Sequence, residues 1–237
     1  QSTGAEVRTA RGQEQVILTS DVNVTVQPKE PASNPLTTEP LKARCERVSY
    51  RKADSIVYFV GSVLIAQGGE EFRADRVDAF FDQQNRVRKI EAYGNASLQS
   101  RADSRVSEVR SRRMGFFFSQ QQRLERAVAD GDAFAILAEA LERRELRTAR
   151  IEVSFSPFGQ KGTEIYPSQV RGDGGRVELK FSAPVAPVAA SRQARSSILS
   201  SVIPSEKRLE ANAVELFYRE GGRDLERIRA SGDVALE

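Results

Sequence analysis

The feature that most constrains this chain is an internal repeat. Residues 72–98 read FRADRVDAFFDQQNRVRKIEAYGNASL, and residues 209–236 read LEANAVELFYREGGRDLERIRASGDVAL. The first segment also aligns without a gap with residues 109–135, and its opening half aligns again around Ile151. A weaker copy covers residues 43–65. Recurrence of this kind indicates stacked supersecondary units that share one core.

Within each unit, the first half carries apolar residues at every second position. This period of two is typical of a strand with one buried face. Polar turn residues follow (DQQN, SQQQ and REGG), and the alternation then resumes from Ile90 to Leu98. Each unit is therefore predicted to be a β-hairpin, and the fold class all-β. The aligned columns are 77, 114, 151 and 214; 79, 116, 153 and 216; and 81, 118, 155 and 218.

A fourth apolar column, at positions 72, 109, 146 and 209, is out of phase with these three by one residue. A β-bulge near the small residue at positions 74, 111, 148 and 211 would restore the phase. A glycine recurs at a fixed place in the units, at positions 61, 94, 131 and 232. Glycine inside a strand usually marks a bulge or tight bend, so we expect the strand to turn a corner there and assign these glycines no ligand role.

The segment 132–146 is ambiguous. Its Ala, Leu, Glu and Arg residues favour a helix by propensity alone. The repeat instead makes it the end of one strand and the start of the next. We predict strands, because tertiary pairing overrides intrinsic propensity.

Two segments interrupt the repeats. Residues 27–40 hold four prolines, and residues 182–207 combine Pro, Ala and Ser, with a possible short strand at 197–203. The predicted organisation is an N-terminal strand fragment (16–26) with a Pro-rich linker in residues 1–40, hairpin repeats in 41–181, an excursion in 182–207 and a final hairpin in 208–237 that packs on the same array.

The side-chain inventory limits the available chemistry. The chain has no His and one Cys, Cys45, which excludes an intrachain disulfide, Ser/His or Cys/His catalysis and a Cys/His zinc site. We expect no metal or cofactor. The net charge of +3 is weak evidence for an acidic partner. No apolar run is long enough to span a membrane. A chain that starts at Gln1 is consistent with a processed product whose export signal was removed.

The repeated unit, apolar-x-Ala-Asp followed by an aromatic residue, a polar turn and Ile-x-Ala-x-Gly-Asn/Asp, resembles the OstA-like family of lipopolysaccharide-transport β-jellyroll proteins (LptA/LptC type). The residues that carry the resemblance are Phe72–Asp75, Ile90–Ala96, Ala127–Ala133, Leu209–Asn212 and Ile228–Val234. The resemblance implies a twisted, partly open two-sheet β-jellyroll in the periplasm. It also implies a hydrophobic groove that binds acyl chains, and it implies that protomers stack end to end.

Splayed sheets would turn the aligned apolar columns into a continuous trough, whereas closed sheets would make them an ordinary sandwich core. The candidate lining residues are Val77, Ala79, Phe81, Ile90, Met114, Phe116, Phe118, Ile151, Val153, Phe155, Val214, Leu216, Tyr218 and Ile228. Arginines flank these positions, either to bind phosphorylated headgroups or simply to solubilise the outer face. The headgroup candidates are Arg73, Arg76, Arg112 and Arg113.

Three functions follow from this pattern. The first is a periplasmic bridge that carries lipopolysaccharide or a related glycolipid towards the outer membrane. The second is a non-catalytic scaffold that assembles end to end, as a homo-oligomer or with other transport proteins, through the edge strands near 16–26 and 228–236. The third is a carbohydrate-active enzyme that uses Asp75/Asp78 or Glu70/Glu71. Because Asp75 recurs as Arg112, Ala149 and Asn212, hairpin geometry explains it better, and we expect no enzyme and no nucleic-acid partner.

Overall fold

The computed structural model describes residues 2–3, 6–10, 15–26, 39–102, 105–139, 142–159, 164–184, 204–222 and 224–237. In these ranges the chain forms antiparallel strands and one short 3-10 turn, η2 (Lys52–Asp54), and the strands hydrogen-bond into a 16-stranded sheet. The strands are β1 (Ser2–Thr3), β2 (Glu6–Ala10), β3 (Gln15–Val26), β4 (Leu41–Arg51), β5 (Ile56–Gln67), β6 (Glu70–Phe81), β7 (Val87–Ala102), β8 (Arg105–Phe118), β9 (Leu124–Glu139), β10 (Glu142–Phe158), β11 (Glu164–Asp173), β12 (Val177–Pro184), β13 (Pro204–Ala211), β14 (Ala213–Tyr218), β15 (Leu225–Ser231) and β16 (Ala235–Leu236).

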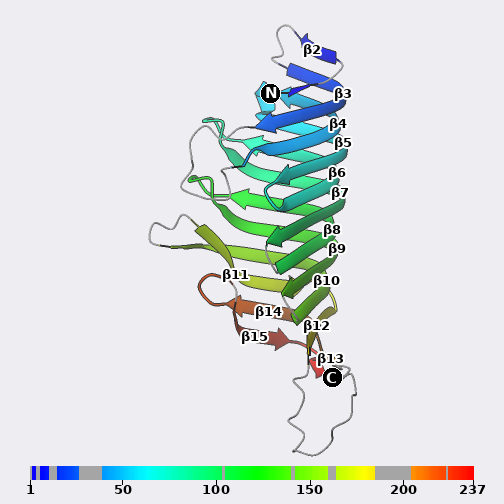
Figure 1. Cartoon of the computed structure of the whole chain (residues 1–237), viewed down its shortest axis with the longest axis vertical. Coiled ribbons are helices and arrows are strands. Elements are labelled where there is room, and N and C mark those ends of the chain that lie inside the picture. The colour runs from blue at the N-terminus through cyan, green and yellow to red at the C-terminus, as the bar shows by residue number, and fades with distance from the viewer. Residues whose placement is uncertain are drawn as a thin grey trace, which may run out of the picture.

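Consecutive strands pair with one another from β3 to β11, as expected for a row of hairpins. Figure 1 shows them stacked along the longest axis of the molecule, from the N-terminal strands at one end to the C-terminal strands at the other. The predicted all-β jellyroll of repeated hairpins is confirmed.

Each long strand bends once, at a register shift in its ladder. In the β6–β7 pair, for example, the shift lies between Arg73 and Arg76, and in the β8–β9 pair between Arg110 and Arg113. The bend divides the sheet into two facing halves. Half-sheet I contains residues 22–26, 41–45, 63–67, 70–74, 96–102, 105–111, 133–139 and 142–148 with β12, β13 and β16; half-sheet II contains residues 15–19, 47–51, 56–60, 76–81, 87–93, 113–118, 124–130 and 150–158 with β11, β14 and β15.

At most corners, two residues with positive φ on one strand face a single residue on the next. The pairs with positive φ are Ser20–Asp21, Gly61–Ser62, Gly94–Asn95, Gly131–Asp132 and Gly232–Asp233. In the β7–β8 ladder, Gly94 and Asn95 lie opposite Arg112 alone. This two-for-one count is a β-bulge, as the sequence predicted, and the recurring glycine occupies its left-handed position.

The ambiguous segment 132–146 forms the end of β9 and the start of β10, which confirms the strand prediction. Ala133 and Leu146 are 2% and 4% exposed, and β9 pairs along its length with both β8 and β10. Sheet pairing and burial on one face therefore override helix propensity here.

The C-terminal strands continue the bend with a break in place of a bulge. β10 pairs with β12 through residues 143–147 and with β11 through residues 150–158. β13 and β14 repeat this division, because β13 pairs with β12 while β14 pairs with β11. The possible strand at 197–203 and most of the linker at 27–40 lie outside the described residues, and the proposed division into segments stays a prediction.

The core lies between the two half-sheets. Phe72 of half-sheet I meets Phe116 of half-sheet II edge to face, with ring centroids 5.5 Å apart. Val77 and Met114, next to the corner, are 1% and 2% exposed. Among the described residues, no helix has the length and apolar character needed to cross a membrane.

The corner geometry predicts that Gly94→Ala destabilises the protein. Gly94 has φ +71, and an added Cβ would collide with the side chain of Asp75, whose own Cβ lies 2.9 Å away. Left-handed backbone in a residue other than glycine costs about 1–3 kcal/mol, and the collision adds to it. We expect a loss of unfolding free energy at the upper end of this range, measured by urea denaturation.

Gly221→Ala is the matched control. Gly221 has φ +90 but nothing within 4 Å of an added Cβ, so only the backbone term applies. Equal losses for the two variants would show that the contact with Asp75 contributes nothing.

Candidate functional site

The aligned apolar residues of half-sheet II form three rows at increasing distance from the corner. In the corner row, Val77, Met114, Ile151 and Val214 are at most 2% exposed. In the second row, Ala79 and Leu216 are buried, whereas Ile90, Phe116 and Val153 are partly buried and Ile228 is 38% exposed. The third row, of Phe81, Phe118, Phe155 and Tyr218, is partly buried throughout. The interior is therefore sealed at the corner and becomes more accessible towards the strand ends.

Half-sheet I supplies the opposite wall. One row of register partners crosses it with an apolar residue on each strand. Its members are Val24, Ala43, Ile65, Phe72, Leu98, Val109, Ala135, Leu146, Leu179, Leu209 and Leu236. We call the space between this row and the rows of half-sheet II the trough.

At the C-terminal end the trough contains a cavity of about 440 Å³. Phe181, Leu209 and Leu236 line it from half-sheet I, and Ile228 and Ala230 from half-sheet II. Lys207 is the one charged lining residue. Of the lining residues, the sequence analysis had proposed only Ile228 as a site residue. Lys207 had been assigned to the irregular segment 182–207, and Leu209 to a column that was used only to place the bulge.

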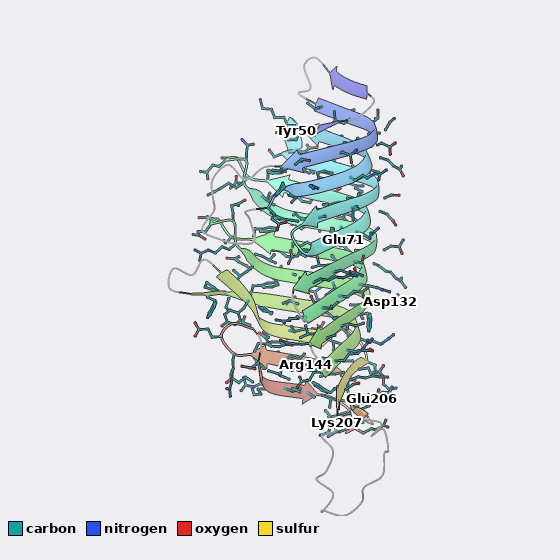
Figure 2. The ribbon with its side chains drawn as sticks, viewed as in Figure 1. Tyr50, Glu71, Asp132, Arg144, Glu206 and Lys207 are labelled. Atoms are coloured by element: carbon teal, nitrogen blue, oxygen red, sulfur yellow. The ribbon has the colours of Figure 1, made fainter. Side chains whose placement is uncertain are left out.

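One row further out on half-sheet I, polar residues face the mouth of the trough. Glu70, Ser107, Arg144 and Lys207 lie two residues before Phe72, Val109, Leu146 and Leu209, so they share the inward face of their strands. They also occupy one repeat column, a signal that was present in the sequence but was not used. Figure 2 labels Arg144 and Lys207 towards the C-terminal end of the stack.

Arg144 reaches across the mouth to the other half-sheet. Its guanidinium lies close enough to the hydroxyl of Tyr218, on half-sheet II, to influence the pKa of that group. Desolvation raises the pKa of Tyr218, while the charges of Arg144 and Arg105 act in the opposite direction. Arg144 also pairs with Glu142 at 3.1 Å.

The four headgroup candidates point away from the trough. Arg73 pairs with Glu71 on the outer face at 2.7 Å. Arg112 pairs with Asp132 at the corner. Figure 2 labels Asp132 at the edge where the strands turn. Arg76 and Arg113 lie on the outer face of half-sheet II, paired with Asp78 and Glu91. Each has a carboxylate partner, and a role in headgroup binding stays a prediction for all four.

Glu91 is the centre of the outer-face charge network. It is 6% exposed, lies 2.8 Å from Lys89 and accepts hydrogen bonds from Arg113 and from the Tyr93 hydroxyl. Desolvation alone would raise the pKa of Glu91, but the hydrogen bonds from Lys89, Arg113 and Tyr93 outweigh it and lower the pKa to about 2. A buried carboxylate with this many donors stabilises the folded state.

The acid pairs considered for catalysis do not share a cleft. Asp75 accepts a hydrogen bond from Asn95 at the corner, whereas Asp78 is bound by Arg76 on the outer face. Glu70 and Glu71 are neighbours on one strand and so point to opposite sides of the sheet. In the described part of the chain, no group of three or more His, Cys, Asp or Glu is arranged to hold a metal ion.

The Glu91 network predicts a pH-dependent stability difference between the wild type and Glu91→Gln. The pKa is about 2 in the folded state and 4.5 normally, so the stabilisation is complete above pH 4.5 and is lost as the pH falls through 2. We expect Glu91→Gln to lower the free energy of unfolding by up to about 3 kcal/mol at pH 7. The difference in unfolding free energy between the wild type and the variant should be smaller at pH 3. Urea denaturation at both pH values measures it.

Glu71→Gln is the control, because it removes only the partly exposed ion pair with Arg73. We expect it to lower the free energy of unfolding by less than about 1 kcal/mol. A loss for Glu91→Gln that is equally small, or that does not change with pH, would contradict the assigned role of Glu91.

Comparison with known proteins adds two findings. Residues 43–138 match the model of the LptA/(LptD N-terminal domain) LPS transport protein family. Among solved structures, the chain is similar to LptH, the LptA homologous periplasmic component of the conserved lipopolysaccharide transport device from Pseudomonas aeruginosa. The identity is 13% and the TM-score 0.41, over 71% of this chain and 94% of that one. No curated protein matches the chain.

The match spans β5 to β8 completely and most of β4 and β9, so it includes the bulged corners and the inward apolar rows of these strands. The resemblance noted in the sequence is thereby confirmed over residues 43–138, the part of the chain that matches the family of LptA and the LptD N-terminal domain.

Proposed function

We propose that this protein is a periplasmic component of lipopolysaccharide transport that carries the acyl chains of the lipid in its trough towards the outer membrane. The observation that carries the proposal is the cavity between the half-sheets. Two of its lining residues, Leu209 and Leu236, belong to the apolar row that crosses half-sheet I, so the cavity lies at the end of that row. The family of residues 43–138 supports lipopolysaccharide as the cargo.

The trough suits this task physically. Acyl chains need only apolar surface, and burial contributes about 0.8 kcal/mol per methylene without directional contacts. The corner row stays packed and holds the fold, so the outer rows are free to exchange a flexible chain. Neighbouring hairpins present similar apolar rows, which favours movement along the trough over retention at one place. The task requires no nucleophile, metal or cofactor.

Photo-crosslinking tests the location of the cargo. A photoreactive amino acid at Phe118 or Ile228, on the inward face, should capture lipopolysaccharide. Phe117 and Phe217 are the controls, because they lie on the outer face, where Arg126 and Arg227 cover their rings at 4.2 Å and 4.4 Å. Capture at the outer positions alone would contradict the proposal.

A second candidate function, an end-to-end scaffold, is supported by the last strand of the array. Among the described residues, β15 pairs with β14 on one side and with no strand on the other. A free edge of this kind is completed by a strand from another chain. Most of its side chains are exposed, so the edge is accessible.

Light scattering over a concentration series tests this assembly. We expect the mean mass to rise with concentration, and a proline at Arg229, in the middle of β15, to reduce the rise by removing a backbone donor. Strict monomers at every concentration would contradict end-to-end assembly and leave the lipid trough as a single-protomer site.

A further inference from the structure

We propose that Lys207 and Arg144 form a binding site for the phosphate of an amphiphile whose chain lies in the C-terminal cavity of the trough. This inference rests on the proposed function and adds to it the residues that recognise the headgroup. They face inward, unlike the arginines that flank the trough on its outside.

Lys207 is the charged group nearest to the cavity. It lines the cavity directly, between the apolar side chains of Phe181 and Leu209. No carboxylate in the described ranges pairs with it, and the neighbouring Glu206 points to the other face, where it lies 3.5 Å from Lys180. An unpaired ammonium beside an apolar cavity is suited to an anionic headgroup.

Arg144 lies in the same row, on the far side of Phe181. The register aligns Arg144 with Phe181 and Phe181 with Lys207, so the two cations are two strand spacings apart, about 10 Å. The guanidinium has five N–H donors, and the contacts with Tyr218 and Glu142 leave donors for an anion. Glu142 is 61% exposed in its side chain, which makes it a weak competitor.

The charge of this row changes sign along the trough. From the N-terminal side, the repeat column reads Glu70, Ser107, Arg144 and Lys207. Glu139 and Glu142 lie one row further out: Glu139 is the register partner of Arg105, and Glu142 lies beside Arg144 on β10, so both are further from Lys207 than Arg144 is. Around Lys207 the lining side chains are apolar. An anionic headgroup is therefore favoured at the C-terminal end and disfavoured near Glu70.

Binding of two amphiphiles with the same tail tests the site. Dodecyl phosphate and the uncharged dodecyl maltoside are titrated into the full chain by calorimetry, with inorganic phosphate as a probe without a tail. We expect Lys207→Gln and Arg144→Gln each to weaken dodecyl phosphate binding about 10-fold, and the double variant more, since each loses a charge-assisted hydrogen bond. Dodecyl maltoside should bind all variants equally.

Arg147→Gln is the matched control, because Arg147 lies on the same strand as Arg144 but on the outer face, over the ring of Phe134 at 4.3 Å. Arg144→Lys should restore most of the affinity. If Arg144→Gln fails to fold, Lys207→Gln, at an exposed position, still decides the question.

Wild-type affinity for dodecyl phosphate in the double variant would overturn the site while leaving the trough intact. Inorganic phosphate that binds as tightly as dodecyl phosphate would overturn the link between the site and the cavity. Failure of both amphiphiles to bind the wild type would overturn the proposed function and the site with it.

Discussion

The structure depends on the bulge that every long strand meets at the same place. Two residues in left-handed conformation face one residue on the next strand, which bends the ladder without ending it. Because the bulges line up from β3 to β10, all strands bend together and a single sheet folds over on itself. The side chains across each corner fit one another: Ser62 contacts Glu46, Asn95 contacts Asp75, and Arg112 pairs with Asp132. If the bulge of one strand were shifted by one residue, the apolar side chains beyond it would point to the wrong face of the sheet.

The bend divides the interior into a packed base and a more accessible mouth. Residues beside the corner, such as Ile151 and Val214, are almost fully buried and form a packed core. Residues further out, such as Phe118 and Ile228, keep part of their surface exposed. In the middle of the array the halves touch through Phe72 and Phe116, whereas at the C-terminal end a cavity separates them. The trough is thus closed at its base and accessible at its mouth, and the ligand proposed for the mouth would leave the core undisturbed.

Charge is distributed differently on the two sides of the sheet. The outer face carries many cations, but those beside the trough positions are held by carboxylates, as Arg76 is by Asp78 and Arg113 by Glu91. These networks are partly buried and fix the outer face. On the inner face of half-sheet I, the charges described above lie at the mouth, in the row of Glu70, Arg144 and Lys207 and in the next row out. For an anionic ligand, a few unpaired inward cations therefore matter more than many outward cations that are already paired.

The hairpin repeat, the strand alternation, the corner glycines and even the strand state of 132–146 could be predicted from the sequence, because they follow from the repeat period and from local backbone requirements. The sequence also identified the inward apolar columns, since alternation alone decides which face a side chain takes. It did not determine which of these residues are sealed and which remain accessible. Val77 and Phe81 share a pattern, yet only the distance of the second half-sheet decides that the first is core and the second lies near the mouth. The same holds for the charges: alternation separates the faces of Arg76 and Arg144, but only the tertiary structure places Asp78 beside the first and Tyr218 across from the second.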